Sequence, residues 1–451
     1  MVSDEEMLSD SVWSLFRRFT FPAVAGILVA GIQTIIDGFF IGNGVGSQGL
    51  AGVTLAFPFV MFIVAAGIMI GMGSASLIAL ELGSSHRDRA MRIMSNVFPL
   101  VAVAGLLITI LGLVLVDPLI GMFEASDLVR SMAGDYMSVI FAGSVLLLLP
   151  LTLDPLVRND GFPLLAMRTM VLAVLANLVL DYLFVMRMDM QLFGAALATV
   201  MAFALSAVIL SMHFFGSRTG LKVSLGTMGF HPGEVLRIVE SGLPSFAMQF
   251  SVAVLFLAHN FVLLQYGDEG AVSAYGIIGY SFAVFYMLFE GIAVGVQPII
   301  GFNYGAGLYD RVCRTLQLAM ATCVAIGSIG VIIVYLVPEM VAGMFNPDTE
   351  EILETTVTGM RIIVASLLVQ GIVVVNATYY QSVNRVGYAL FIHLGKIFVF
   401  MFPLLLALPM FFGLHGVWFA TPVADYLMFA VVMVMLYDEL KVLRGEKCRT
   451  P

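Results

Sequence analysis

Long apolar segments, separated by short charged or Gly/Pro-rich breaks, run through nearly the whole of this chain. At a rise of about 1.5 Å per residue, each segment is long enough to cross the roughly 30 Å hydrocarbon core of a bilayer as a helix. We therefore predict an all-α membrane protein with twelve transmembrane helices. The helices are expected near residues 14–42, 50–81, 93–116, 128–152, 162–186, 193–215, 237–264, 271–304, 315–337, 353–381, 388–411 and 415–437.

The composition excludes several other classes of protein. With 60% hydrophobic and 11% charged residues, the chain is too apolar for a soluble globular protein. The few basic residues are scattered, so no nucleic-acid partner is expected. Three dispersed cysteines suit a bacterial or archaeal inner membrane and provide neither a disulfide framework nor a metal site (Cys313, Cys323, Cys448). The acidic N-terminus lacks the positive region of a signal peptide, so no cleavage is expected.

The basic residues between the segments predict the orientation, because Lys and Arg concentrate on the cytoplasmic side. Most fall on one side: Arg17, Arg18, Arg87, Arg89, Arg92, Arg158, Arg168, Arg218, Lys222, Arg237, Arg311, Arg314, Arg385, Lys441, Arg444, Lys447 and Arg449. The opposite loops are acidic, with Arg130, Arg187 and Arg361 as their main basic exceptions: Asp117, Glu124, Asp127, Asp268, Glu269, Glu339, Asp348, Glu350 and Glu351. A multi-pass protein of the cell inner membrane with both termini in the cytoplasm is expected.

The two halves of the sequence repeat at a constant offset of 222 residues. Pro22 falls on Pro244, Gly73 on Gly295, Asp88 on Asp310, Arg89 on Arg311, Gly194 on Gly416 and Thr199 on Thr421. Six spans used twice predict two six-helix lobes related by a pseudo-two-fold axis along the membrane normal. We expect an N-terminal lobe over residues 1–215, a cytoplasmic linker over 216–236, and a C-terminal lobe with a cytoplasmic tail over 237–451.

Two acidic residues lie inside predicted spans of the N-terminal lobe. Asp181 follows Asn177 by four residues, and Asp37 follows Gln33 by four, so each acid shares a helix face with an amide. A carboxylate in a membrane costs several kcal/mol unless it meets a partner, a cation, a proton or water, which makes both acids candidates for a functional site. The alternative is a helix-packing role, with each acid satisfied by a neighbour.

If Asp37 and Asp181 face each other, burial and like-charge repulsion both disfavour two ionised carboxylates, so the pair can exchange protons. With the oxygens of Asn177 and Thr199 they would also form an all-oxygen site for Na⁺, a hard cation. At the repeat offset, Asp37 corresponds to His259, and Asn177 and Asp181 to Val399 and Pro403. The predicted coupling chemistry is therefore confined to the N-terminal lobe.

These residues and spans resemble the multidrug and toxic compound extrusion (MATE) transporters, and within them the DinF-like branch. The resemblance covers nearly the whole chain and is specific in three places: Ile36–Gly38 with Gly42 and Gly49–Gly52; Gly295–Gly307; and Asn177–Asp181 with Gly194–Thr199. It implies a secondary active antiporter that exports lipophilic, often cationic drugs in exchange for H⁺ or Na⁺ by alternating access. It also implies a cation or proton site at Asp37, Asn177, Asp181 and Thr199, and a cavity lined by Tyr136.

The sequence departs from the family pattern after the fourth predicted span. Asp154 stands where relatives commonly have Asn, so a third acid could reach the N-lobe cavity; alternatively, Asp154 pairs with Arg158 at helical spacing. The acidic residues of spans seven and ten that mark NorM-like relatives are missing. A C-lobe cation site of that kind is therefore not expected.

Polar residues also occur in the predicted spans of the C-terminal lobe. His259, Glu290, Lys396 and Asp425 could form a charged network that faces the substrate, and Gln33 is a further cavity candidate. Alternatively, Lys396 and His393 snorkel near the cytoplasmic end while Glu290 and Asp425 pair with them to hold helices together.

Other functions fit the sequence less well than the transport of drugs. A flippase for lipid-linked precursors needs a strongly cationic cavity, and only Arg361 approaches that description. An integral membrane enzyme needs a clustered catalytic motif, which we do not find, so no enzymatic activity and no cofactor beyond the coupling ion are expected. A channel fits poorly with an acid pair inside one lobe. The expected partners are toxic organic cations and membrane lipids, and the expected state is a monomer.

Overall fold

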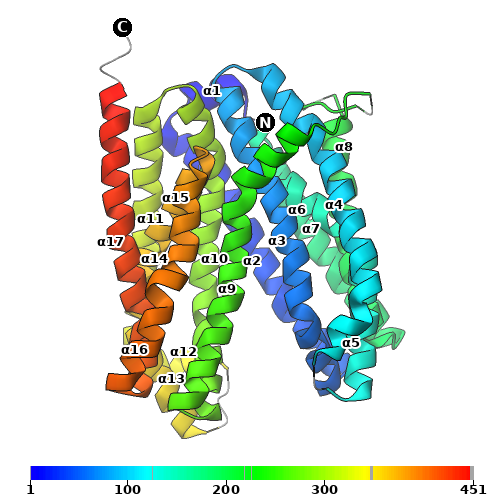
Figure 1. Cartoon of the computed structure of the whole chain (residues 1–451), viewed down its shortest axis with the longest axis vertical. Coiled ribbons are helices and arrows are strands. Elements are labelled where there is room, and N and C mark those ends of the chain that lie inside the picture. The colour runs from blue at the N-terminus through cyan, green and yellow to red at the C-terminus, as the bar shows by residue number, and fades with distance from the viewer. Residues whose placement is uncertain (1, 124, 218, 225, 346–348, 447–451) are drawn as a thin grey trace. The chain divides into compact units, whose positions relative to one another are not determined.

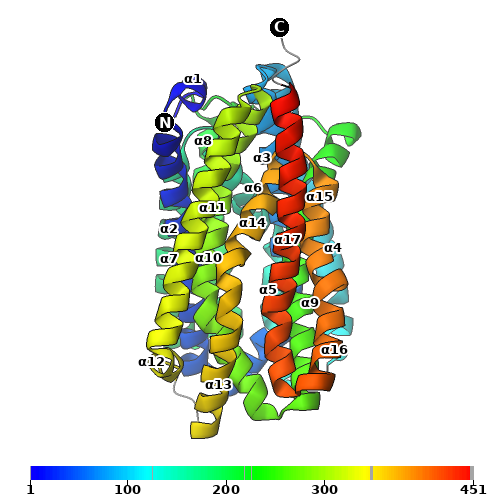
Figure 2. The same cartoon turned by 90° about the vertical axis from the view of Figure 1, so that its left-hand side faces the viewer.

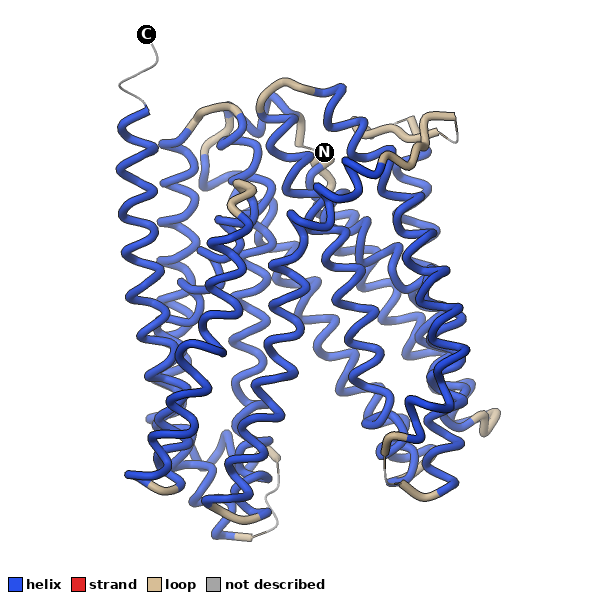
Figure 3. The backbone as a smooth tube through the Cα atoms, viewed as in Figure 1, coloured by secondary structure: helices blue, strands red, loops and turns tan. Residues whose placement is uncertain are grey.

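The computed structural model describes residues 2–123, 125–217, 219–224, 226–345 and 349–446, and this part of the chain contains helices and loops without any strand (Figure 3). Glu124, Arg218, Asp348, Lys447, Cys448 and Arg449 lie outside the described residues. The first elements are α1 (Asp4–Ser9), α2 (Val12–Gly44), α3 (Ser47–Gly83), α4 (Arg87–Gly121), α5 (Asp127–Ala142), α6 (Ser144–Asn159), α7 (Pro163–Asp181), η1 (Tyr182–Arg187), α8 (Gln191–Phe215) and α9 (Pro232–Tyr266). They are followed by α10 (Glu269–Gly305), α11 (Tyr309–Leu336), α12 (Pro338–Gly343), α13 (Glu350–Ile363), η2 (Val364–Ser366), α14 (Leu367–Ser382), α15 (Val386–Leu390), η3 (Phe391–Met401), α16 (Phe402–Phe412) and α17 (Leu414–Glu446).

The number of membrane spans agrees with the prediction. Within the described residues, 11 helical segments are long and apolar enough to cross a membrane, and a bent pair raises the number to 12. That pair is α5 and α6, which meet at an angle of 57° within the region where we predicted one span, near residues 128–152. Gly143 lies at the break, and a side chain there would collide with Val200 of α8. The chain is therefore an all-helical, multi-pass membrane protein.

The helices gather into two compact units. Unit 1 comprises residues 1–9 and 25–246, and unit 2 comprises residues 10–24 and 247–451. Both boundaries fall inside long helices, at Val24/Ala25 of α2 and Phe246/Ala247 of α9, so the first part of α2 packs in unit 2 and the first part of α9 in unit 1. In each unit the long helices run side by side along a common direction (Figures 1 and 2). The predicted lobe limits, 1–215 and 237–451, remain a prediction.

Unit 1 is built around close contact between α3 and α6. A Cβ added at Gly71 of α3 would meet the backbone of Leu151 and Thr152 in α6, so only glycine allows this approach. The Thr152 hydroxyl donates a hydrogen bond to the Gly67 carbonyl oxygen at 3.1 Å, and the Asn159 amide donates one to the Ala75 carbonyl oxygen. Small residues and interhelical hydrogen bonds hold helices together where lipid removes the hydrophobic driving force.

Unit 2 follows the same packing rule. A Cβ at Gly327 of α11 would collide with the backbone of Leu367, which begins α14. At one end of the unit, Glu439 of α17 accepts a hydrogen bond from the Tyr379 hydroxyl at 3.1 Å and pairs with Arg385 at 2.5 Å. These contacts hold the end of α17 that carries Glu439 against α14.

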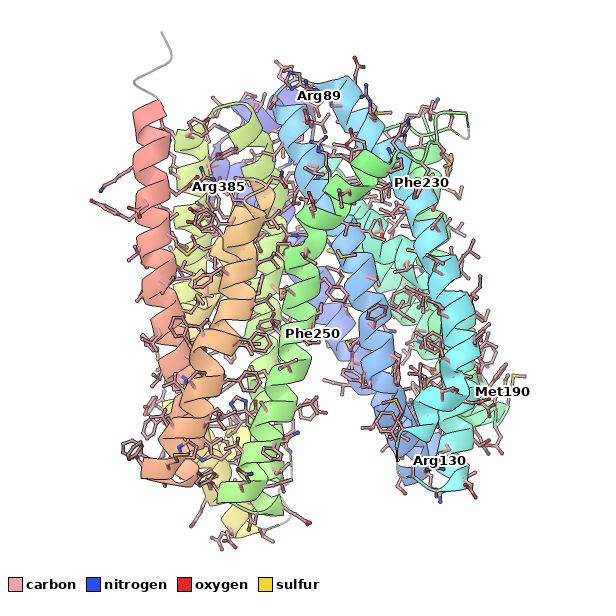
Figure 4. The ribbon with its side chains drawn as sticks, in the orientation of Figure 1. Arg89, Arg130, Met190, Phe230, Phe250 and Arg385 are labelled. Atoms are coloured by element: carbon pink, nitrogen blue, oxygen red, sulfur yellow. The ribbon has the colours of Figure 1, made fainter. Side chains whose placement is uncertain are left out.

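The helices of unit 1 carry an arginine at each end. Arg89 and Arg130 lie at opposite ends of the helices in Figure 4, as expected if Arg130 is an exception among acidic loops.

A short helix that we did not predict, α1, forms near the N-terminus. Ser3 and Glu6 cap it reciprocally, with the Glu6 carboxylate accepting from the Ser3 backbone N–H at 2.8 Å.

Candidate functional site

Two pairs of polar side chains join α2 to α7 inside unit 1. The Gln33 amide of α2 donates a hydrogen bond to Asn177 Oδ1 of α7 at 2.8 Å. One helical turn further along each helix, the carboxyl groups of Asp37 and Asp181 lie within hydrogen-bonding reach of each other. Both predicted i, i+4 pairs therefore face the same interface, and the amide pair sets the register that brings the acids together.

The two acids are largely shielded from solvent. Asp181 is 2% exposed and Asp37 is half-buried, and one oxygen of each is buried without a protein donor among the described residues: Asp37 Oδ1 and Asp181 Oδ2. Carboxylates have acceptors only, so two ionised acids cannot hydrogen-bond to each other. A proton shared between the acids, or a bound cation, would satisfy these two oxygens.

The helix changes its geometry directly after Asp181. The α-helix α7 ends at this residue, and the π-helix η1 continues the same span to Arg187, close to the predicted end at residue 186. π-helical turns are rare and often occur at functional sites. The sequence carries no signal that would have predicted this change.

Tyr136 and Thr199 lie on α5 and α8 of the same unit. Tyr136 is 9% exposed and lies within electrostatic range of both carboxyl groups. The Thr199 hydroxyl donates a hydrogen bond to the Ala195 carbonyl oxygen at 3.1 Å, which leaves its oxygen lone pairs as the groups it can offer a cation. The structure therefore brings Tyr136 to the acids, whereas the contact of Thr199 with them stays a prediction.

The donor set is suited to a sodium ion by its chemistry. Two carboxylates and the Asn177 amide oxygen are hard oxygen ligands, which hard cations prefer. The described residues contain no group of three or more His, Cys, Asp or Glu side chains that could hold a transition metal. The two orphaned carboxylate oxygens are the atoms that a Na⁺ ion or a proton would satisfy.

Asp154 forms an ion pair, as one of its two interpretations required. Arg158 donates to both carboxylate oxygens of Asp154, from Nε at 2.8 Å and from an Nη atom at 3.1 Å. The Arg158 side chain is 2% exposed and that of Asp154 is 22% exposed. Asp154 is therefore the counter-ion of a buried arginine, whose burial the sequence analysis did not predict.

The polar residues of unit 2 form a cluster that differs in part from the expected network. Lys396 of η3 forms an ion pair with Asp425 of α17, and His259 Nε2 of α9 lies 3.2 Å from the Thr421 hydroxyl of α17. Glu290 of α10 lies near Tyr286 and makes no ion pair among the described residues. The predicted pairing of Lys396 with a carboxylate is found, and the one involving Glu290 is not.

Comparisons with known proteins agree with this architecture. The MatE family model matches residues 22–183 and 244–407, and the two matches begin 222 residues apart (244 − 22 = 222), at the offset of the sequence repeat. The multidrug export protein MepA of Staphylococcus haemolyticus (strain JCSC1435) is 23% identical over 442 residues, covering 97% of this chain and 96% of that protein. MepA of Staphylococcus aureus (strain N315) is 24% identical over 429 residues, covering 94% of each.

Solved structures are similar over the whole length. The MATE multidrug transporter DinF-BH has a TM-score of 0.88 and 29% identity, covering 96% of this chain and 97% of its own. The structure of MATE in complex with MaL6 has a TM-score of 0.93 and 22% identity, covering 99% of this chain and 100% of its own.

Proposed function

This chain belongs to the MatE family of multidrug efflux transporters, and from that premise we propose that it is a secondary active antiporter that exchanges lipophilic cations for H⁺ or Na⁺. The observation that carries the proposal is the buried pair of Asp37 and Asp181, joined across α2 and α7 without other donors for two of its oxygens. Such a pair has no stable state without a proton or cation, which is the property a coupling site needs.

Binding and release of a proton or Na⁺ at the pair of Asp37 and Asp181 can change the shape of α2. When a proton or Na⁺ satisfies the acids, the two helices are held together; when it leaves, like charges repel and the acids demand solvation. Pro22, Gly26 and Gly31 lower the resistance of α2 to bending, and the boundary between the two units falls at Val24/Ala25, between the first two of them. We propose that α2 bends there, and that the bend expels the drug outward.

The proposal includes the cellular setting. We propose that the protein is a monomer of the cytoplasmic membrane, and the concentration of its basic residues on one side supports a cytoplasmic location of both termini. Its partners are toxic organic cations and the surrounding lipids, and its only cofactor is the coupling ion. The flippase alternative is not favoured, since the curated relatives are multidrug export proteins.

Transport assays in proteoliposomes test whether H⁺ or Na⁺ drives export. The purified chain is given a pH gradient or a Na⁺ gradient alone, and transport of ethidium, a flat lipophilic cation, is followed by its fluorescence on DNA trapped inside the liposomes. Asp37→Asn and Asp181→Asn should each lose gradient-driven transport while remaining folded, because an amide fills the same space but cannot change its charge. Asp117→Asn is the matched control, because Asp117 is an exposed acid of α4. Undiminished flux in both site variants would remove the pair from the mechanism.

A further inference from the structure

The buried ion pair of unit 2 takes no part in the proposed coupling chemistry. Asp425 is fully buried on α17, and its partner Lys396 lies in the middle of the 11-residue π-helix η3 with 19% of its side chain exposed. An isolated charge pair inside a membrane span is costly unless its remaining hydrogen-bonding capacity is satisfied. The atoms of the pair that still lack partners therefore decide what it can bind.

The carboxylate of Asp425 lacks hydrogen-bond donors. Asp425 Oδ2 is buried and has no hydrogen-bond partner in the described part of the chain, although a carboxylate can accept about four hydrogen bonds. The Lys396 side chain is 19% exposed, whereas that of Asp425 is fully buried, so the unmet hydrogen-bonding capacity lies mainly with the carboxylate. The site is thus short of donors, and a group that brings N–H donors would satisfy it.

The nearby hydroxyl of Thr421 does not supply the hydrogen-bond donor that Asp425 lacks. Thr421 lies one helical turn before Asp425, on the same face of α17. His259 Nδ1 is 2.9 Å from the Leu255 carbonyl oxygen, which only accepts, so Nδ1 carries the hydrogen. In the neutral ring Nε2 must then accept, and the Thr421 hydroxyl donates to it at 3.2 Å. The proton of Thr421 is committed to His259, and Asp425 remains without a second donor.

The cluster also occupies the repeat-related place of the N-terminal site. At the offset of 222, Asp37 corresponds to His259 (37 + 222 = 259) and Thr199 to Thr421 (199 + 222 = 421). The second half of the chain therefore keeps polar side chains at two of these places, His259 and Thr421, and the Lys396–Asp425 pair lies near them.

We propose that Asp425 is a binding site for the primary ammonium group of exported compounds, and that the Lys396 ammonium occupies it at rest. This inference rests on the proposed export of cations and specifies the group that unit 2 recognises. An incoming alkylammonium replaces the Lys396 ammonium at the carboxylate, so Asp425 is never left unpaired, and the displaced Lys396 ammonium turns toward the exposed side of its helix. The exposed part of the Lys396 side chain marks the side from which the ligand approaches.

Chemical complementation tests the site directly. Lys396→Ala removes the part of the side chain that n-propylammonium reproduces, from Cγ to Nζ. Thermal unfolding of the purified full-length protein is measured with n-propylammonium chloride, with n-propanol, and with tetramethylammonium chloride, which lacks N–H donors. Lys441→Ala is the matched control, since Lys441 is an exposed lysine on α17 that lies over the Tyr437 ring.

We expect n-propylammonium to stabilise Lys396→Ala saturably, with a roughly 100-fold shift in the folding equilibrium at 100 times its Kd. n-Propanol should have no effect, and tetramethylammonium should act weakly. The stabilisation should be absent from Lys441→Ala and from the double variant Lys396→Ala/Asp425→Asn. Equal responses in the single and double variants, or no response in Lys396→Ala, would overturn the proposal and leave the ion pair a structural link between η3 and α17.

If Lys396→Ala does not fold, the yield itself becomes the measurement. The variant is expressed and purified in n-propylammonium or in n-propanol, and the monodisperse fraction is compared. Recovery with the amine alone supports the site, and equal yields contradict it. These measurements involve no transport, so a failure of the proposed antiport, seen in proteoliposomes of the unmodified chain, is distinguishable from a failure of this inference.

Discussion

Removing the charge of Asp154 tests whether this acid serves as the partner of a buried arginine. Asp154→Asn leaves the guanidinium of Arg158, which is 2% exposed, without its counter-ion. Breaking a buried ion pair from one side costs about 3–5 kcal/mol, and we take the low end because 22% of the Asp154 side chain is exposed. About 3 kcal/mol corresponds to a roughly 150-fold change in the folding equilibrium.

The reverse substitution should cost less. Arg158→Met removes the buried partner and leaves an acid that can still reach solvent, so we expect a loss of about 1 kcal/mol. The double variant Asp154→Leu/Arg158→Met leaves no buried charge and should recover most of the stability lost in Asp154→Asn. Stability is measured by thermal unfolding of the purified protein, with Asp117→Asn as the exposed control.

The same variants decide between the two interpretations of Asp154. A structural partner predicts that the double variant, once stable, exports ethidium in proteoliposomes at a rate close to that of the unmodified chain. If Asp154→Asn is as stable as Asp117→Asn and yet abolishes export, the ion-pair argument is refuted. Asp154 would then act as a third acid of the N-lobe cavity.

Two further predictions concern packing in unit 1 and the segment predicted to link the two lobes. Gly73→Ala places a methyl group against the Ile238 carbonyl oxygen and the Gly242 backbone in unit 1, so it should destabilise the protein by about 1–3 kcal/mol in thermal unfolding, whereas Gly121→Ala, which meets nothing, should not. Asp160→Ala should expose the linker to trypsin at Lys222, because Asp160 accepts hydrogen bonds from the Gly220 and Leu221 backbone N–H groups at 2.9 and 3.1 Å. About 1 kcal/mol per lost hydrogen bond would accelerate cleavage several-fold, and an unchanged cleavage rate relative to Asp117→Ala would contradict this role.

The helical spans could be predicted because hydropathy is a local property. A stretch of apolar residues that enters lipid must satisfy its own backbone, so its length alone indicates a helix. The repeat offset of 222 is equally a property of the residues, and the two family matches begin at that spacing. The 57° bend between α5 and α6 was not predicted, because it lies at Gly143 beside Val200 and no break in hydropathy marks it.

The candidate site was predictable in its residues and partly in its geometry. The i, i+4 spacing placed each amide and acid on one face, but the contact between Gln33 and Asn177 joins residues 144 positions apart and follows from the way α2 meets α7. The π-helix after Asp181 was likewise outside the reach of sequence patterns.

What the amino-acid sequence determined by itself was the number of spans, the repeat and the polar residues that must lie inside the membrane. The tertiary structure alone decided which of these residues meet: Asp37 with Asp181, Arg158 with Asp154, and Lys396 with Asp425 instead of Glu290. The physical reason is that lipid is as apolar as the helix surfaces, so the hydrophobic effect does not determine which helices pack against each other. That choice depends on close van der Waals packing and interhelical hydrogen bonds, which exist only once the helices are assembled.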